Sequence, residues 1–183
     1  MTTTTLPTEL ATGTYVIDAS HSEAAFTVRH AGIAKVRGTV AITEGTITVG
    51  EDGVASVTAT LDPTTVDTRD ANRDGHLKSA DFFEVETYPT WSFVSTSVEH
   101  DGDDWVVTGD LTIHGVTKQV RLETEFNGTA TDPFGNARAG FSATTEISRK
   151  EFGLTWNAAL ETGGVLVADK VKIGLEISAI RQA

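Results

Sequence analysis

Apolar and polar residues alternate with a period of two through most of this chain. In one such segment Ala55, Val57, Ala59 and Leu61 occupy one face, and the residues between them are Ser or Thr. The alternation recurs at 24–29, 55–61, 105–113, 120–126, 139–143 and 170–178. Successive side chains of a β-strand point to opposite faces, so the pattern predicts a set of amphipathic strands, each with one face exposed to water.

The connections between these segments favour antiparallel pairing. Clusters of Glu, Asp and Gly at 51–53 and 101–104 are typical of hairpin turns. Strong helical periodicity is missing from the sequence, and only a turn or two of helix is expected, near 75–82. Without a βαβ rhythm the fold class is all-β, either an antiparallel sandwich or a closed barrel, and the pattern alone leaves these two open.

Length, charge and composition narrow the function classes. At 183 residues the chain fits one domain, predicted at 14–183 after a short disordered tail at 1–13. The sequence has no apolar run of about 18 residues, so membrane insertion is not expected. Because the N-terminus lacks the basic and apolar regions of a secretory signal, the expected location is the cytoplasm.

The balance of charged residues and the lack of cysteine exclude further classes. Lys and Arg number 14 against 26 Asp and Glu, a net charge of −12 that repels phosphate backbones, so nucleic acid is not an expected partner. With no cysteine, the chain has no disulfide, no thiolate nucleophile and no Cys-based metal site.

Residues 67–93 interrupt the strand pattern. The segment opens on the charged, turn-forming run 67–75 and closes on Trp91-Ser92-Phe93, which alternates as a half-buried strand does. Between them, Leu77, Phe82 and Phe83 are too apolar for a fully solvated loop. Two interpretations stay open: a polar lip leading into a ligand-binding interior, or an ordinary loop whose aromatic residues are buried in the core.

The inward faces of the predicted strands mix large aromatic residues with alanine. Phe26, Trp91, Phe93, Trp105 and Phe141 fall on these faces. The alanines among them are Ala24, Ala55, Ala59, Ala139 and Ala143. Small residues either let the aromatic rings interdigitate or leave space for a guest, and a packed core is the commoner outcome.

A calcium-loop motif occurs within 67–93 but is incomplete. Asp70, Asn72 and Asp74 have the spacing of an EF-hand loop, with glycine in the position that follows. Lys78 then places a cation beside the proposed ion, and Asp81 is shorter than the glutamate that the motif requires. We therefore expect no bound cation, and expect the carboxylates to form hydrogen bonds and ion pairs with Arg69 and Arg73.

The sequence contains no recognisable catalytic constellation. The five histidines do not share the i, i+4 spacing of a helical metal site or the i, i+2 spacing of a strand. Ser22 follows His21 directly, which places the two side chains on opposite faces of a strand. We therefore expect no enzymatic activity, no metal and no cofactor.

The chain resembles the YceI-like family of lipocalin-fold proteins. The motifs that carry the resemblance run in family order from about residue 15 to residue 180. They are Asp18-Ala19-Ser20-His21-Ser22, Phe26-Thr27-Val28-Arg29-His30, residues 68–83, Tyr88-Pro89-Thr90-Trp91-Ser92-Phe93, residues 109–118, Gly140-Phe141 and residues 148–154. Each motif is weak alone, whereas the ordered set is specific.

The resemblance implies an elongated antiparallel β-barrel of the extended lipocalin type and often a homodimer. It implies a tunnel that takes a long apolar ligand, typically a polyisoprenoid or quinone-like lipid. Many relatives are periplasmic and carry a cleaved signal. This chain departs from them in that no such signal is expected. The residues expected against the ligand are Phe26, Val28, Phe82, Trp91, Phe93, Leu111, Ile113 and Phe141, with the polar end of the ligand near Arg73, His76 and Lys78. The alternatives are a structural dimerising β protein without a ligand, or a metal-assisted hydrolase.

Overall fold

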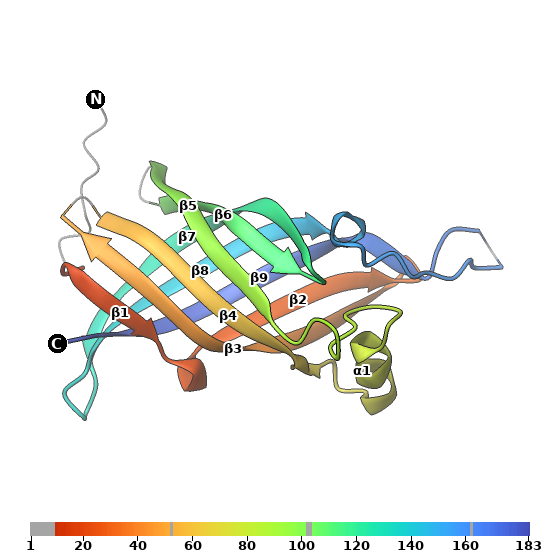
Figure 1. Ribbon diagram of the computed structural model, residues 1–183, viewed down its shortest axis with the longest axis horizontal. Helices are drawn as coiled ribbons and strands as arrows, with labels where there is room; N and C mark the ends of the chain where they lie inside the picture. The colour runs from red at the N-terminus through yellow and green to blue at the C-terminus, as the bar shows by residue number, and fades with distance from the viewer. Residues whose placement is uncertain (1–9, 52, 102–103, 162) are drawn as a thin grey trace.

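The computed structural model describes residues 10–51, 53–101, 104–161 and 163–183, and in this part of the chain almost every element is a β-strand (Figure 1). The strands are β1 (Gly13–Ile17), β2 (Glu23–His30), β3 (Ala34–Gly50), β4 (Gly53–Asp67), β5 (Trp91–Asp101), β6 (Asp104–Ile113), β7 (Val116–Thr131), β8 (Ala137–Ser148) and β9 (Val167–Arg181). The helices are α1 (Ala71–Lys78) and the two short 3-10 helices η1 (Ala19–His21) and η2 (Arg149–Phe152).

The strands form a closed antiparallel barrel. From β2 the hydrogen-bonded order runs through β9, β8, β7, β6, β5 and β4 to β3, and β3 pairs with β2 again to complete the ring. The prediction of an all-β, extended lipocalin-type barrel is therefore confirmed, and the sandwich alternative is excluded. Closure leaves no free edge along these strands, which removes the usual route to edge-to-edge aggregation.

One position in the ring is shared by two short strands. β1 pairs with the last part of β3 and with the end of β9, and β2 pairs with the first part of β3 and the preceding part of β9. The η1 turn separates them, and the Asp18 side chain begins this turn by accepting a hydrogen bond from the Ser20 backbone N–H. The break between β1 and β2 therefore lies between β3 and β9, which both continue past it.

Long strands give the barrel its elongated shape (Figure 1). β3 contains 17 residues, which corresponds to about 55 Å of extended chain. Register shifts in β3 and β4 mark bulges, which bend and twist the sheet as closure requires. We call the end of the barrel at which α1 and η2 lie the helix end, and the end at which β1 begins and β9 finishes the termini end.

Two clusters of buried apolar side chains fill much of the interior. The cluster at the termini end includes Tyr15, Trp105 and Phe141, and it also includes Leu10, which precedes β1. The cluster at the helix end includes Phe83 and Phe152 among its buried members. The tail expected at 1–13 falls mainly on residues 1–9, and these lie outside the described residues.

The short helix expected at 75–82 is present but lies four residues earlier, at Ala71–Lys78. The reason is the cap: Asp70 Oδ1 accepts hydrogen bonds of 3.0 Å from the backbone N–H groups of Asn72 and Arg73. The hairpins expected at 51–53 and 101–104 connect antiparallel pairs, β3 with β4 and β5 with β6. Their residues 52, 102 and 103 lie outside the described part of the chain.

Candidate functional site

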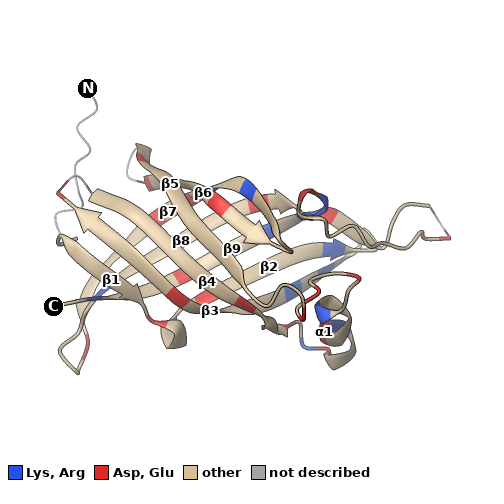
Figure 2. Ribbon diagram, viewed as in Figure 1, with Lys and Arg blue, Asp and Glu red and all other residues tan. Residues whose placement is uncertain are grey.

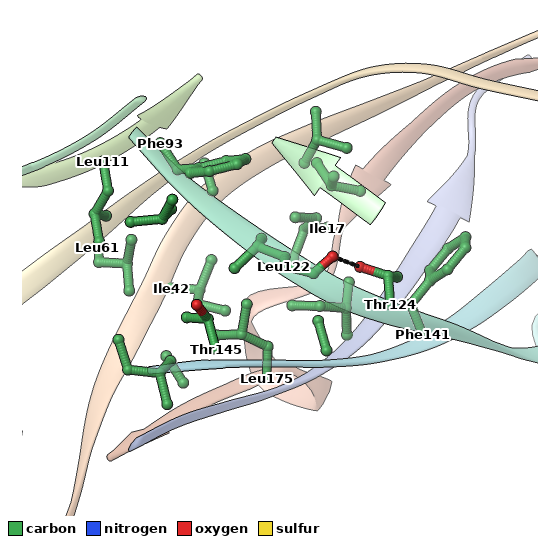
Figure 3. Close-up of a pocket in the computed structure, with 18 of the residues that line it drawn as sticks. Ile17, Ile42, Leu61, Phe93, Leu111, Leu122, Thr124, Phe141, Thr145 and Leu175 are labelled. Carbon is green, nitrogen blue, oxygen red and sulfur yellow. Dashed lines mark hydrogen bonds between the residues drawn. The ribbon is translucent and has the colours of Figure 1, made fainter. Parts of the chain in front are cut away.

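The inward faces of the strands enclose an apolar cavity of about 160 Å³ (Figure 3). Its lining side chains come from every strand from β1 to β9. Within the described residues, the polar side-chain atoms of this lining belong to Thr124, Thr145 and the indoles of Trp91 and Trp105. The Thr124 hydroxyl donates to the Leu122 backbone carbonyl at 3.1 Å, so it is satisfied locally (Figure 3).

No charged side chain lines this cavity within the described part of the chain. Figure 2 shows Asp and Glu distributed along the barrel, with Lys and Arg on α1 and near the helix end. An apolar cavity of roughly 150 Å³ stays dry and admits a compact apolar guest such as benzene. The cavity therefore suits an apolar group, and a longer chain requires side chains at one end of the cavity to move.

Two glycines set the size of this space. A Cβ atom on Gly38 would lie 2.3 Å from Cζ of Phe26, and one on Gly109 would lie 2.5 Å from Cζ of Phe93. The tip of each phenylalanine ring therefore lies close to the backbone of a neighbouring strand. Larger residues at either glycine would push the rings away from the wall and into the cavity.

The structure brings six of the eight residues expected against the ligand to the cavity wall: Phe26, Trp91, Phe93, Leu111, Ile113 and Phe141. The other two lie elsewhere. Val28 is half-buried on β2, nearer the helix end, and Phe82 packs with Trp156 at a ring-centroid distance of 5.3 Å. Whether the eight bind a ligand stays a prediction.

Sequence reasoning missed several lining residues, such as Ile42, Leu122 and Leu175. The signal was present in the same alternation, since Leu122 and Leu175 fall on faces that the pattern marks as inward. What the pattern could not give was which of the many inward residues surround the open space.

Residues 71–90, which we call the cover segment, pack over the helix end of the barrel, next to the apolar cluster there and outside the lining of the cavity. Phe82 and Phe83 are buried, and the Phe83 ring meets the Trp91 ring edge-on with centroids 4.8 Å apart. The backbone hydrogen bonds of the segment are short-range, for example from Phe83 N to Leu77 O at 2.8 Å. The cover segment thus keeps its shape by local bonds and contacts the barrel mainly through side chains.

His114 connects the cover segment to η2. Its Nε2 lies 3.3 Å from Glu84 Oε2, its Nδ1 lies 3.2 Å from the Phe152 carbonyl oxygen, and its ring packs against Tyr88 with centroids 4.9 Å apart. The turn between β6 and β7 that carries His114 therefore holds both elements that close the helix end.

The three residues expected near a ligand head group lie on α1, away from the cavity wall. Arg73 donates from Nε to Thr68 Oγ1 at 2.8 Å and from Nη2 to the Thr68 carbonyl at 2.7 Å. His76 lies 2.9 Å from an Asp81 oxygen and packs against Phe82 and Trp156. Lys78 ends the helix. The head-group role of these residues stays a prediction.

The carboxylates of the calcium-like motif form hydrogen bonds within the protein. Asp70 caps α1, and Asp74 Oδ1 accepts from the Thr68 backbone N–H at 2.9 Å and from the Thr68 hydroxyl at 2.5 Å. The expected hydrogen bonding is therefore present. The expected ion pairs with Arg69 and Arg73 do not occur among the described residues, because Arg73 bonds to Thr68 instead.

A buried arginine organises the loop that follows η2. Only 4% of Arg149 is exposed, and its guanidinium donates to four backbone carbonyls. The acceptors are Leu154, Trp156, Val167 and Ala168, at 2.6–3.1 Å. Burial lowers the pKa of Arg149, and the nearby charge of Asp169 opposes this effect. The arginine thereby fixes Leu154, a buried residue of the cluster at the helix end.

A polar network at the termini end joins Arg138 of β8 to the turn between β7 and β8 and to the break between β1 and β2. Arg138 donates to Asp132 at 2.8 Å and to Asp18 at 2.9 Å, next to the break between β1 and β2. The hydrogen bond from Arg138 is the largest effect that holds the pKa of Asp18 well below its ordinary value. For Asp132 the backbone N–H of Asn136 is the largest effect, followed by Arg138, and its pKa is also well below the ordinary value.

Among the described residues, no group of three or more His, Cys, Asp or Glu side chains is placed to hold a metal ion. In the same part of the chain, no helix has the length and apolar character that crossing a bilayer would need.

A closed antiparallel barrel around an apolar cavity is the architecture of the lipocalin-like binding proteins. The family model described as YceI-like domain matches residues 15–179, most of the barrel. The chain belongs to the YceI-like family, so the family resemblance in the sequence is confirmed.

A curated relative supports this assignment, and solved structures share the fold. Protein YceI of Escherichia coli O17:K52:H18 (strain UMN026) is 44% identical over 144 residues, which cover 76% of this chain and 75% of the relative. The crystal structure of BcnA from Burkholderia cenocepacia has a TM-score of 0.76 at 22% identity and covers 88% of this chain and 98% of BcnA. A structure from Saccharophagus degradans is described as a polyisoprenoid binding domain implicated in plant cell wall breakdown. It has a TM-score of 0.66 at 15% identity, and the match covers 94% of this chain and 100% of that domain.

Proposed function

We propose that this protein is a non-enzymatic barrel that binds a long-chain apolar ligand, of the polyisoprenoid or quinone-like class, with its apolar part in the cavity. The observation that carries the proposal is the cavity itself, which every strand lines and which no charged side chain reaches within the described residues. The description of the Saccharophagus degradans domain as polyisoprenoid binding supports the same ligand class.

The energetics favour such a ligand. Burial of apolar surface contributes about 25 cal/mol per Å², so even a modest chain gains several kcal/mol before its ordering costs are subtracted. Phe26, Phe93 and Phe141 provide broad aromatic contact surfaces, while Ala59 and Ala143 leave the space between them. An apolar guest would replace empty volume with van der Waals contacts.

The helix end is the proposed entrance. The cover segment lies across it and keeps its conformation through short-range backbone bonds. Displacing this segment would separate Phe83 from Trp91 and break the contact between His114 and Glu84 without disturbing the hydrogen bonds between barrel strands. This end of the cavity can therefore open at a lower energetic cost than the sheet.

Blocking the cavity tests the proposal. Ala143→Trp places a large side chain in the cavity, whereas Thr144→Trp places the same side chain on the outer face of the same strand, where Thr144 is exposed. We expect Ala143→Trp to reduce binding of the C20 alcohol geranylgeraniol at least tenfold, and Thr144→Trp to leave it unchanged. Native mass spectrometry after incubation with the alcohol measures both.

The same pair of variants distinguishes a filled core. If the interior has no function as a binding site, geranylgeraniol binds neither variant nor the unchanged protein, and Ala143→Trp destabilises the fold by roughly 1–3 kcal/mol through overpacking. That result would support the structural alternative. The expected homodimer and cytoplasmic location also stay predictions, to be checked by analytical ultracentrifugation and cell fractionation.

A further inference from the structure

Trp91 carries an unused hydrogen-bond donor at the cavity wall. The residue is 8% exposed and lines the cavity, and its indole Nε1 is fully buried without a protein acceptor within hydrogen-bond distance. Trp91 is the first residue of β5 and pairs with Leu61 of β4, which anchors its backbone at the helix end of the barrel. The backbone that carries the indole is therefore fixed by the sheet.

A buried donor without an acceptor is costly, and its neighbours offer little compensation. A polar group that loses its hydrogen bonds to water on burial destabilises the folded state. The neighbouring Phe83 ring, edge-on to Trp91 at 4.8 Å, offers at most a weak acceptor in its π-face. A water molecule needs two to four polar partners, and the lining around Trp91 is almost entirely apolar.

We infer that the ligand carries one neutral oxygen acceptor that binds Trp91 Nε1–H inside the barrel. This inference rests on the proposed function. The acceptor would be a carbonyl, ether or hydroxyl oxygen, as in an isoprenoid ketone or a quinone. A charged phosphate does not fit this position, because no cation lines the cavity within the described residues, and the Nε and Nη2 groups of Arg73 already bind Thr68.

The inference separates two otherwise similar ligands. Farnesylacetone is an isoprenoid ketone, and its partner probe is the hydrocarbon in which a CH₂ group replaces the carbonyl. We expect the protein to bind the ketone about tenfold more tightly, because only the ketone satisfies the indole N–H. In Trp91→Phe, which keeps an aromatic ring but removes the donor, we expect this preference to disappear while the hydrocarbon still binds.

Trp105→Phe is the matched control, since Trp105 also lines the cavity and undergoes the same change. It should retain the tenfold preference. Calorimetric titration of both probes into the three proteins gives the comparison, and hydrocarbon binding reports whether each variant keeps its cavity. Equal affinity of the unchanged protein for both probes overturns the acceptor inference alone. A preference that survives Trp91→Phe overturns the assignment to Trp91, and failure of both probes to bind overturns the proposed function with it.

Discussion

The two ends of the barrel are closed in different ways. At the termini end the closing side chains stand on the strands themselves, such as Tyr15 on β1, Trp105 on β6 and Phe141 on β8, apart from Leu10, which precedes β1. At the helix end, strand residues are joined by Phe82 and Phe83 from the cover segment and by Phe152 from η2. The termini end is thus part of the hydrogen-bonded sheet, while the helix end is closed by elements added to it.

This difference indicates which end of the barrel can open at the lower energetic cost. Opening the termini end would require strand pairs to separate, which breaks backbone hydrogen bonds between neighbours. Opening the helix end requires the buried Phe82 and Phe83 to leave their apolar contacts and a few side-chain bonds to break, but no strand pair to separate. Low-stability elements of a fold are the ones from which binding lids are drawn. The comparison therefore supports the helix end as the route into the cavity.

The largest expected effect comes from Arg149→Leu at the helix end. The change leaves one buried and three part-buried carbonyls without their donor, so we expect unfolding stability to fall by at least about 3 kcal/mol. For a domain of this size the melting temperature should drop by roughly 6–12 °C. Urea unfolding followed by tryptophan fluorescence measures the loss.

Arg181→Leu is the control at the termini end. Arg181 is exposed and donates only to the Thr12 carbonyl among the described residues, so the loss should be about 1 kcal/mol or less. A similar loss in both variants would contradict the view that the helix end depends on a buried guanidinium while the termini end depends on the sheet.

A second, smaller effect is expected from acid at the termini end. The folded-state pKa values of Asp18 and Asp132 lie well below the ordinary 3.8, so the unfolded chain binds more protons as pH falls below about 4. Their stabilising contribution is complete above this range and is lost as pH falls toward the lowered values. Urea midpoints measured from pH 5 down to pH 2 should therefore decrease.

Asp132→Asn removes part of this dependence. We expect the variant to be less stable than the unchanged protein at pH 6 and to lose less stability on acidification. Glu44→Gln, at an exposed position on β3, is the control and should follow the unchanged protein. An acid profile that is the same in all three proteins would show that other carboxylates control the transition.

Asp169 is expected to make the helix end contribute to the loss of stability at low pH as well. Burial acts to raise its pKa, but hydrogen bonds from Ser148 and from the Lys150 backbone, together with nearby Lys charges, outweigh burial and lower it. Because the folded pKa is again the lower one, protonation at this end also favours unfolding. The acid response therefore belongs to both ends. Asp132→Asn should remove only the contribution of Asp132 and leave those of Asp18 and Asp169.

The smallest expected effect is that of Arg73→Ala in the cover segment. Removing its bonds to Thr68 should lower stability by about 1 kcal/mol, or 2–4 °C in melting temperature. Because the Nε and Nη2 groups of Arg73 already bind Thr68, binding of geranylgeraniol and of geranylgeranyl diphosphate should change equally little. A selective loss of the diphosphate would instead support the head-group role expected from the sequence.

Much of the fold was predictable because strand alternation is a local property. Val57 and Ala59 on β4, and Leu175 and Ile177 on β9, face inward as the period of two requires. A short helix was predictable, but its position was predicted four residues too late. The helix begins after Asp70 because this residue has an extended backbone and caps the helix with its side chain, which the local pattern did not indicate. The sharing of one barrel position by β1 and β2 left no recognisable signal, because it depends on pairing with strands far away in the sequence.

The sequence by itself determined which side chains face the interior, that the interior is apolar, and the family to which the chain belongs. Only the tertiary structure decided that the interior contains a space rather than a filled core. That space depends on how Phe26 lies over Gly38 and Phe93 over Gly109, which are contacts between strands. The unused Trp91 donor was decided in the same way, since its lack of an acceptor is a property of everything packed around it and cannot be read from the local sequence.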